Sequence, residues 1–148
     1  MPERVLSDKE LSPELNELTH RVIGACIEVH RTLGPGLLES AYETCLCREL
    51  SLSGLAFQRQ HPVPLIYKGA HLDGGYQLDL VVAGSAIVEL KAVDTLLPIH
   101  EAQIITYLKL TGLPVGLLVN FNVPTLVRGV KRFANTASQS SAPFAPLR

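Results

Sequence analysis

The sequence is poor in features that define whole classes of protein. It contains only three cysteines, Cys26, Cys45 and Cys47, which supply neither an even set for disulfides nor paired Cys-x-x-Cys ligands for zinc. Its five histidines are scattered rather than spaced as zinc ligands. No stretch approaches the run of about 18 apolar residues that a membrane-spanning helix needs. These absences argue against a disulfide scaffold, a zinc module and a membrane-spanning protein.

An excess of positive charge is also missing. The 13 lysines and arginines are balanced by 14 aspartates and glutamates, so the formal net charge is −1. Proteins that grip a polyanion usually carry a positive potential. Tight, sequence-independent binding of nucleic acid is therefore not expected, and a nucleic-acid ligand would need a local basic face. The candidates for that face are Arg59, Lys109, Arg128, Lys131 and Arg132.

What the chain does have is the composition of one compact soluble domain. Hydrophobic residues make up 47% of its 148 residues and charged residues 18%, and a chain of this length buries roughly 70% of its unfolded surface. We expect an N-terminal arm at 1–14, one folded domain at 15–134 and a disordered tail at 135–148, where Ala, Ser, Pro and Gln dominate. The first residues lack the features of a signal peptide, so a cytoplasmic protein is expected.

Turn and cap signals divide the folded part into elements. Ser12-Pro13 is typical of a helix start, and Gly34-Pro35-Gly36 and Gly112-Leu-Pro114 are typical of helix ends. Pro62 and Pro64 predict an edge strand or a bulged strand. We expect helices at about 13–33, 37–53 and 97–110, strands at about 57–67, 72–82, 86–92 and 115–121, and a strand or helix at about 126–133.

The predicted helix at 97–110 links two strands. The strand at 115–121 is almost wholly apolar, as expected for a strand buried on both faces, and a strand-helix-strand unit predicts a parallel connection to 86–92. On the helix we expect one stripe with His100, Gln103 and Tyr107, and a second stripe facing the sheet with Ile104, Ile105 and Leu108.

Three charged residues interrupt the apolar hairpin at 77–91. Glu89 and Lys91 are two positions apart on one strand and therefore point to the same side. Asp79 is on the preceding strand, so its side depends on the hairpin register. Because an unpaired buried carboxylate is costly, two carboxylates and an ammonium on buried strands indicate a shared counterion, most simply a divalent metal.

Two registers are compatible with a turn at Gly84. A three-residue loop of Ala83, Gly84 and Ser85 places Asp79 opposite Glu89, with their Cβ atoms roughly 5 Å apart. A two-residue loop shifts the pairing by one and moves Asp79 to the opposite face. We favour the first register, because it creates one wholly apolar face. That face would contain Leu78, Leu80, Val82, Ala86, Val88 and Leu90, and the other would carry Asp79, Val81, Ile87, Glu89 and Lys91.

Adjacent carboxylates with carbonyl oxygens nearby offer the hard ligands that Mg²⁺ or Mn²⁺ prefers, and they leave positions for water and a phosphate. The Lys91 ammonium could orient that water or neutralise charge developing on phosphorus. The alternative is an ordinary salt bridge between Lys91 and one carboxylate at a strand end.

These residues also resemble a known family. Asp79 followed by Glu89-Leu-Lys91 resembles the Asp…Glu-x-Lys core of the PD-(D/E)xK nuclease superfamily, and the stretch Gln103-Ile-Ile-Thr-Tyr107 resembles the Gln-x-x-x-Tyr motif of its RecB-like members. The stretch Gly36-Leu-Leu-Glu39-Ser-Ala-Tyr42 resembles the signature of the small bacterial GxxExxY proteins. The resemblance covers about 22–133. Leu78 stands where the motif has proline, which removes no ligand.

The resemblance implies a restriction-endonuclease-like α/β fold, with a mixed sheet of about four to five strands flanked by helices in the order αβββαβ. It implies Mg²⁺ or Mn²⁺ held by Glu39, Asp79 and Glu89. It assigns catalysis to Asp79, Glu89 and Lys91, with Gln103 and Tyr107 in support. An iron–sulfur cluster, as in some RecB-like nucleases, needs four cysteines, and the chain has three.

The leading prediction is a Mg²⁺-dependent nuclease acting on nucleic acid, DNA rather than RNA. The rival is a nuclease-fold module with weak or absent catalysis that binds a protein or a nucleic acid, which the small size and the acidic charge favour. A third hypothesis is an enzyme acting on small nucleotides. A homodimer or a partner protein is left open, and no membrane association is expected.

Overall fold

The computed structural model describes residues 11–72 and 75–135. The helices in these ranges are α1 (Pro13–Leu33), α2 (Glu39–Leu52) and α3 (Pro98–Thr111). The strands are β1 (Phe57–Pro62), β2 (Leu65–Tyr67), β3 (Ala70–Leu72), β4 (Gln77–Val82), β5 (Ala86–Lys91), β6 (Val115–Asn120) and β7 (Val130–Ala134), and a short 3-10 helix, η1 (Leu126–Gly129), precedes β7. None of these helices combines the length and the apolar character that a membrane span requires.

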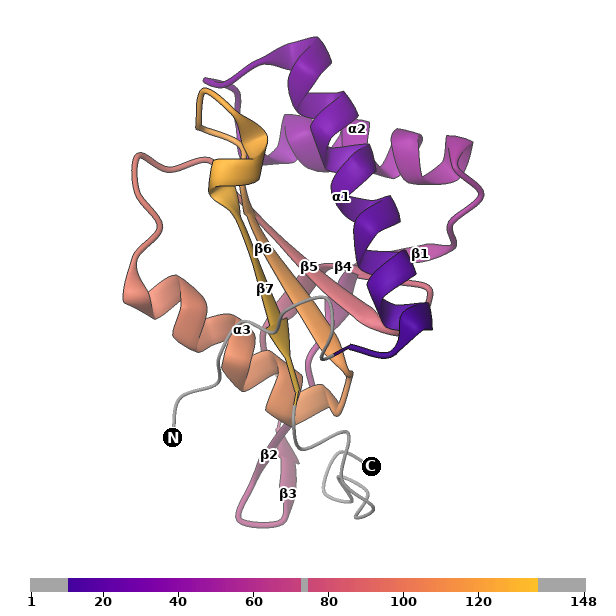
Figure 1. The fold of residues 1–148 in the computed structure, drawn as a ribbon. Helices are drawn as coiled ribbons and strands as arrows, with labels where there is room; N and C mark the ends of the chain where they lie inside the picture. The colour runs from indigo at the N-terminus through magenta and orange to yellow at the C-terminus, as the bar shows by residue number, and fades with distance from the viewer. Residues whose placement is uncertain (1–10, 73–74, 136–148) are drawn as a thin grey trace.

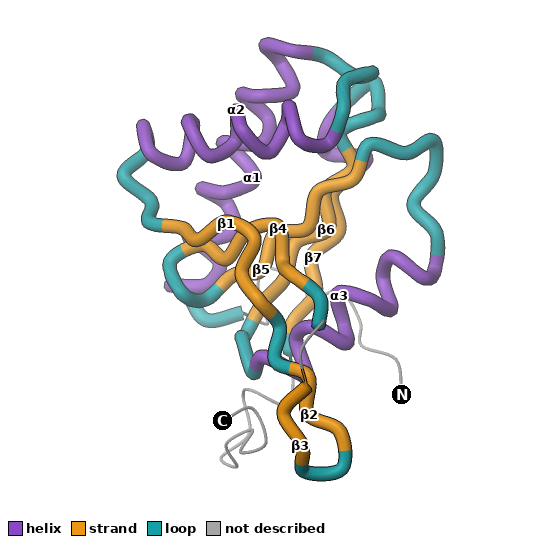
Figure 2. The backbone as a smooth tube through the Cα atoms, turned by 180° about the vertical axis from the view of Figure 1, so that it is seen from behind, coloured by secondary structure: helices purple, strands orange, loops and turns teal. Residues whose placement is uncertain are grey.

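Five strands form one mixed sheet in the order β1-β4-β5-β6-β7. Neighbouring strands are antiparallel except β5 and β6, which are parallel and are connected through α3. Helices α1 and α2 cover one face and α3 lies on the other, while β2 and β3 form a separate ribbon that extends beyond the sheet (Figure 1, Figure 2). The predicted α/β fold is therefore confirmed, including β1 as an edge strand.

The helices begin and end where the cap signals predicted. Ser12 caps α1 by accepting a hydrogen bond from the backbone N–H of Leu15 at 3.2 Å, and Pro13 occupies the first turn. Gly34 follows α1 and Gly112 follows α3, each with a φ of +72°. Only glycine adopts this backbone conformation without strain, so both glycines stop their helices.

Apolar side chains pack against both faces of the sheet in two clusters of unequal size. The larger cluster lies between the sheet and the helices α1 and α2, and its bulkiest members include Tyr42, Leu46, Leu50 and Phe121. The smaller cluster lies beneath α3 and includes Ile104, Leu108, Leu118 and Phe133. Every residue of β6 is buried, as its apolar run predicted.

The single strand predicted at 72–82 is wrong, because Leu72 belongs to the ribbon and the five-stranded sheet is joined only from Gln77. β3 ends at Leu72 and pairs with β2, and β4 begins at Gln77. Gly75 approaches Val63 so closely that a Cβ on Gly75 would lie 2.7 Å from the Val63 carbonyl oxygen. The Val63 N–H in turn donates to the Tyr76 carbonyl at 2.7 Å. These close backbone contacts tie the base of the ribbon to the end of β4.

The boundaries of the folded part also need correction. Asn135, which we assigned to the tail, is buried, and its amide donates to the carbonyls of Leu108 and Leu113 at 2.7 and 3.0 Å. At the other end, Pro13 and Glu14 belong to α1 rather than to an arm. The rest of the predicted tail, 136–148, and most of the predicted arm, 1–10, lie outside the described residues.

Candidate active site

The hairpin of β4 and β5 has the predicted register. Val82 pairs with Ala86 and Leu80 with Val88, which leaves a three-residue loop and confirms that prediction. Ala83 and Gly84 have φ values of +54° and +63°, and the N–H of Ser85 donates to the Val82 carbonyl at 3.0 Å. The same count places Asp79 next to Glu89, immediately beyond the last paired residues.

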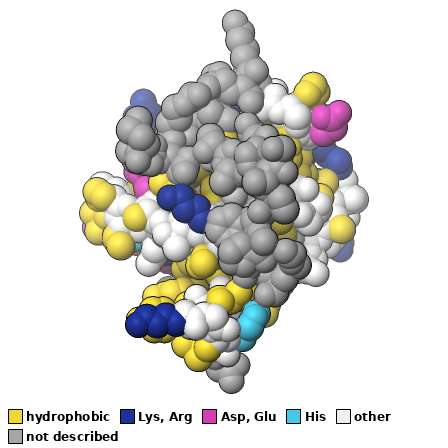
Figure 3. Space-filling model, turned by 90° about the horizontal axis from the view of Figure 1, so that it is seen from below, with side chains coloured by type: hydrophobic (Ala, Val, Ile, Leu, Met, Phe, Trp, Pro, Cys, Tyr) yellow, Lys and Arg dark blue, Asp and Glu magenta, His cyan; other side chains and the backbone are white. Residues whose placement is uncertain are grey.

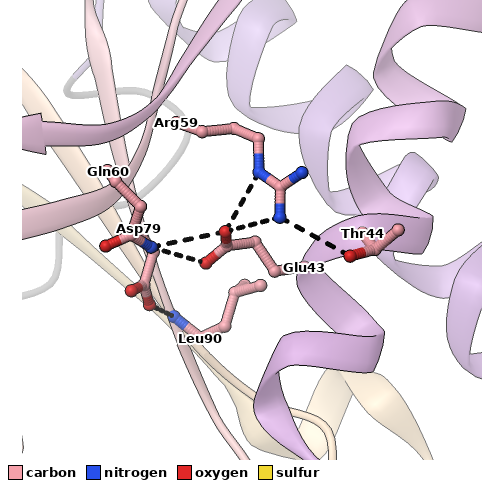
Figure 4. Close-up of polar contacts among 6 residues, drawn as sticks. All are labelled: Glu43, Thr44, Arg59, Gln60, Asp79 and Leu90. Atoms are coloured by element: carbon pink, nitrogen blue, oxygen red, sulfur yellow. Dashed lines mark hydrogen bonds and ion pairs between the residues drawn. The ribbon is translucent and has the colours of Figure 1, made fainter.

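Side chains replace backbone pairing at this end of the hairpin. The N–H of Asp79 donates to a carboxylate oxygen of Glu89 at 3.3 Å, and the N–H of Leu90 donates to Oδ2 of Asp79 at 2.8 Å. Figure 4 shows the second of these contacts. Each acid is therefore held by the backbone of the opposite strand, and the two carboxyl groups lie side by side between the strands.

The change from backbone to side-chain pairing also shifts the face of one leucine. Leu80 and Val82 pack in the larger cluster, and Val81 and Ile87 pack in the smaller one, as the register predicted. Leu78 was expected beside Leu80, but it packs in the smaller cluster with Val81. The strict two-residue alternation of β4 ends at Asp79, whose side chain turns toward β5, so residues before and after it do not share a face.

Burial and mutual repulsion govern the charge of the acid pair. Burial, followed by the charge of Asp79, raises the pKa of Glu89 to about 9. The pKa of Asp79 is also raised, mainly by burial, and the charge of Glu43 adds to this. Without a cation the pair therefore keeps a proton at neutral pH.

Lys91 ends β5, where it is half-buried. Its charge lowers the pKa of both acids, although this is the last and smallest of the causes. Among residues 11–72 and 75–135 its ammonium makes no hydrogen bond or ion pair, so the ordinary salt bridge that we considered is not formed there. A cation close to the acids but unpaired with either is available to a ligand.

A polar cluster that we did not predict lies beside Asp79, where α2 meets β1. The buried side chain of Glu43 accepts hydrogen bonds from Arg59 at 2.9 and 3.1 Å and from Gln60 at 3.0 Å. Figure 4 shows this cluster next to Asp79. Gln60 has a φ of +49°, unusual for a residue other than glycine. Glu43 follows Glu39 by one helical turn, which is the sequence signal that could have marked it.

Glu39 itself is exposed at the first turn of α2, and no described contact joins it to the hairpin acids. Gln103 and Tyr107 both line a cavity beside α3. Tyr107 shares this cavity with Gln103, as expected for one stripe, but it is only 8% exposed and also packs with Ile104 and Leu108, which the prediction did not include. Burial, followed by the charge of Glu89, raises the pKa of Tyr107. The roles of Glu39, Gln103 and Tyr107 stay predictions.

The predicted basic face is not assembled as expected. Arg59 is engaged by Glu43, and Lys131 by Glu101. Arg132 is buried, and its guanidinium donates to Asn16 and Thr19 at 3.1 Å. It stabilises the packing of β7 against α1 and is not on the surface to meet a phosphate.

Tyr42, the last residue of the Gly36–Tyr42 stretch, holds the loop after α1 and packs in the core. Its hydroxyl donates to the Gly34 carbonyl at 2.6 Å and accepts from the N–H of Leu37 at 3.2 Å. Its ring stacks on Phe121 at 4.4 Å. Nearby, the ring of His30 hydrogen-bonds the Val123 carbonyl at 2.7 Å and so ties α1 to the segment after β6.

Comparison with protein families assigns the chain to a class. A family model described as the PD-(D/E)XK nuclease superfamily matches residues 16–133. The chain belongs to the PD-(D/E)XK nuclease superfamily. Its five-stranded mixed sheet flanked by three described helices is consistent with that fold, and membership suggests nuclease activity and nucleic-acid binding. No match was found among curated proteins or solved structures.

The superfamily typically uses divalent metals, so the fit of this site to a metal can be judged from its donors. Asp79 and Glu89 supply two adjacent hard carboxylates, and no cation in the described part of the chain forms an ion pair with either, so they are a suitable donor set. Within residues 11–72 and 75–135, however, no three acidic, histidine or cysteine side chains converge closely enough to form a complete ligand group. The charge of a third acid, Glu43, helps to raise the pKa of Asp79, but the carboxylate of Glu43 is engaged by Arg59 and Gln60.

Proposed function

We propose that this protein is a Mg²⁺- or Mn²⁺-dependent nuclease that hydrolyses phosphodiester bonds, in DNA rather than RNA, with Asp79, Glu89 and Lys91 as catalytic residues. One observation carries the proposal. The buried carboxyl group of Glu89 and the half-buried one of Asp79 lie side by side at the open end of a hairpin, next to an ammonium that no described side chain neutralises. Superfamily membership supports the class of reaction.

Asp79 and Glu89 would hold the cation, because its charge offsets the burial and repulsion that raise both of their pKa values. When bound, Mg²⁺ lowers the pKa of a coordinated water and neutralises charge on a phosphate. On α2, Glu39 and Glu43 are both candidates for a further ligand. Glu43 acts electrostatically on Asp79, but it would first have to give up hydrogen bonds to Arg59 and Gln60.

The other residues position the acids, the water and the substrate, and stabilise the charge that develops on the phosphate. The N–H of Leu90 keeps Asp79 turned toward Glu89. The ammonium of Lys91 orients the attacking water and stabilises the negative charge that develops on the phosphoryl oxygens. Tyr107, whose side chain points from α3 toward the sheet, limits access of bulk water to Glu89. Gln103, which lines the same cavity, offers an amide to the substrate. The residues in these roles come from β4, β5 and α3, and α2 offers the candidates for a further metal ligand.

Cleavage assays test the roles of the hairpin residues. Labelled single- and double-stranded DNA and RNA are incubated with Mg²⁺ or Mn²⁺. We expect Asp79→Asn and Lys91→Met to lower the cleavage rate at least about 10²-fold, because each removes a charge needed at the reacting phosphate. Lys68→Met, on the exposed turn between β2 and β3, is the matched control. Unchanged cleavage in the Asp79 and Lys91 variants would refute their roles.

Calorimetry with Mn²⁺ tests the metal site separately from catalysis. At about pH 7, binding should release close to one proton, because the pKa of Glu89 is about 9 in the absence of metal. Asp79→Asn should abolish the saturable binding. Glu39→Gln and Glu43→Gln, compared under the same conditions, show which acid of α2 contributes more to Mn²⁺ binding.

A second candidate function is a nuclease-fold module that binds a partner without efficient catalysis. The hydrogen bonds that engage Glu43, and the net charge of −1, favour it. Its signature would be the absence of saturable Mn²⁺ binding by the wild-type protein together with the absence of cleavage. Metal binding that depends on Asp79 would contradict it.

A further inference from the structure

A cavity of about 340 Å³ opens between α3 and the base of the β2–β3 ribbon. Its walls include Pro64, Leu65, Tyr76, Ile99, Gln103 and Tyr107, and none of its lining residues is charged. The size is at the lower end of the range typical of small-molecule sites, roughly 300–1,000 Å³. The cavity is therefore suited to a small and largely apolar group.

Two tyrosines from different elements form one corner of this cavity. The rings of Tyr76 and Tyr107 lie 5.8 Å apart and are inclined by 50°, so they meet at an angle rather than closing into a stack. Tyr76 is 64% exposed although it is aromatic. On the face seen from below, toward which the ribbon extends, hydrophobic side chains gather (Figure 3). An exposed ring at the mouth of an apolar cavity is a surface on which another flat ring can stack.

The position of Tyr76 is fixed by the backbone around it. The Tyr76 carbonyl accepts the hydrogen bond of the Val63 N–H, and Gly75 leaves no room for a side chain against Val63. Tyr107 is fixed by its burial in the smaller cluster. The cavity is therefore preformed, which lowers the entropic cost of binding.

The cavity and the acid pair meet at Tyr107. Tyr107 lines the cavity and belongs to the same apolar cluster as Leu78, which precedes Asp79 on β4, and Ile87, which lies two residues before Glu89 on β5. Burial and the charges of Glu89 and Asp79 raise the pKa of Tyr107, in agreement with this placement. An uncharged aromatic cavity thus adjoins a charged site. A nucleotide has the same division, with a flat neutral base next to an anionic phosphate.

We infer that the cavity binds one unpaired nucleobase next to the scissile phosphate, with Tyr76 as its stacking surface, and that the substrate is single-stranded nucleic acid. This inference rests on the proposed nuclease function. In a duplex the base is paired and stacked on its neighbours, so it reaches a side cavity only after it has left the helix. Stacking accepts every base, which fits a cavity with no charged group to read base edges.

A thermodynamic cycle on binding tests the inference without catalysis. Fluorescence anisotropy measures binding, in EDTA, of a labelled single-stranded DNA oligonucleotide and of the same oligonucleotide with abasic sites, to wild type and to Tyr76→Ala. We expect Tyr76→Ala to weaken binding of the intact oligonucleotide about 5- to 150-fold and to leave binding of the abasic one unchanged. Tyr76→Phe, which keeps the ring, should bind as wild type does.

Tyr67→Ala is the matched control, because Tyr67 is 61% exposed on the same ribbon but does not line the cavity. Equal losses for the intact and abasic oligonucleotides in Tyr76→Ala would overturn the inference, as would equal binding of a blunt duplex and the single strand by wild type. If wild type binds as expected but cleaves nothing, the proposed function fails and the base site stands. If wild type cleaves DNA but Tyr76→Ala changes binding of the intact and the abasic oligonucleotide equally, only the proposal of a base site fails.

Discussion

The two faces of the central sheet differ in what they bury. The face under α1 and α2 is filled by the larger cluster, in which Tyr42, Leu46 and Leu50 are fully buried. The face under α3 has the smaller cluster, and it also borders the cavity and the carboxyl groups at the end of the hairpin. One sheet thus has a larger apolar core on one side, and a smaller core with an adjoining cavity and the acid pair on the other.

This difference assigns separate tasks to the two faces. A closely packed apolar face contributes most of the hydrophobic stabilisation, because that term follows the apolar area removed from water. Buried acids that lack a counterion lower stability, and they persist where a ligand is to be bound. We therefore expect the α1–α2 face to contribute most of the stability, and the α3 face, together with the hairpin acids and the candidate ligands of α2, to determine what the protein binds.

Truncation of one leucine on each face gives the largest expected effect. Leu46→Ala, in α2, should lower the free energy of unfolding by about 2–5 kcal/mol, because it leaves a hole in a filled cluster. Leu110→Ala, in α3, should cost only about 1 kcal/mol, because Leu110 is half-buried and already borders the cavity. Urea denaturation measures both. Equal losses would show that the faces are packed alike.

Replacement of the buried Glu89 by glutamine should stabilise the protein. The pKa of Glu89 is about 9 in the folded protein and 4.5 is its ordinary value. Between these values the folded state keeps a proton that the unfolded state has released, so stability falls as the pH rises through this window. In EDTA at about pH 8, Glu89→Gln should be more stable than wild type by about 1–3 kcal/mol.

That gain should shrink as the pH is lowered and should vanish below about pH 4.5, where both states are protonated. Urea denaturation at several pH values measures it, with Glu17→Gln, an exposed residue of α1, as the control for loss of one carboxylate. A Glu89→Gln protein that is less stable than wild type at about pH 8 would contradict the assignment of Glu89 as a destabilising buried acid.

The smallest predicted effect concerns a polar group on the packed face. Tyr42→Phe keeps the ring on Phe121 but removes the hydroxyl that bonds Gly34 and Leu37. The expected loss of stability is about 1 kcal/mol. Thermal denaturation compares it with Tyr67→Phe, on the exposed ribbon, where no change is expected. A large loss of cleavage without a loss of stability would instead place Tyr42 in the substrate site.

Local signals account for the parts of the fold that were predicted correctly. The cap at Ser12, the glycines after α1 and α3, and the three-residue loop at Gly84 each depend on neighbours within a few residues along the chain. The adjacency of Asp79 and Glu89 follows from the same short-range count. Hydrophobic alternation selected the register, because a shift by one would have placed an acid among the leucines.

Residues whose neighbours come from distant segments could not be assigned this way. The pairing of Glu43 with Arg59 joins α2 to β1, and the inward turn of Tyr107 depends on packing beneath α3. Arg132 looked like a surface cation, but it is buried against α1 by contacts more than 100 residues away along the chain. No spacing within one element contains this information.

The order of the elements, the turn of the hairpin and the acids at its open end follow from the pattern of residues, because backbone sterics and side-chain periodicity act over short distances. Three features follow from the packing of the folded chain instead: which helical acid lies near Asp79, which cations are already engaged, and the presence of a cavity next to the site. Those outcomes depend on how separate elements pack, and packing is settled by the shapes of surfaces that meet only in the folded chain.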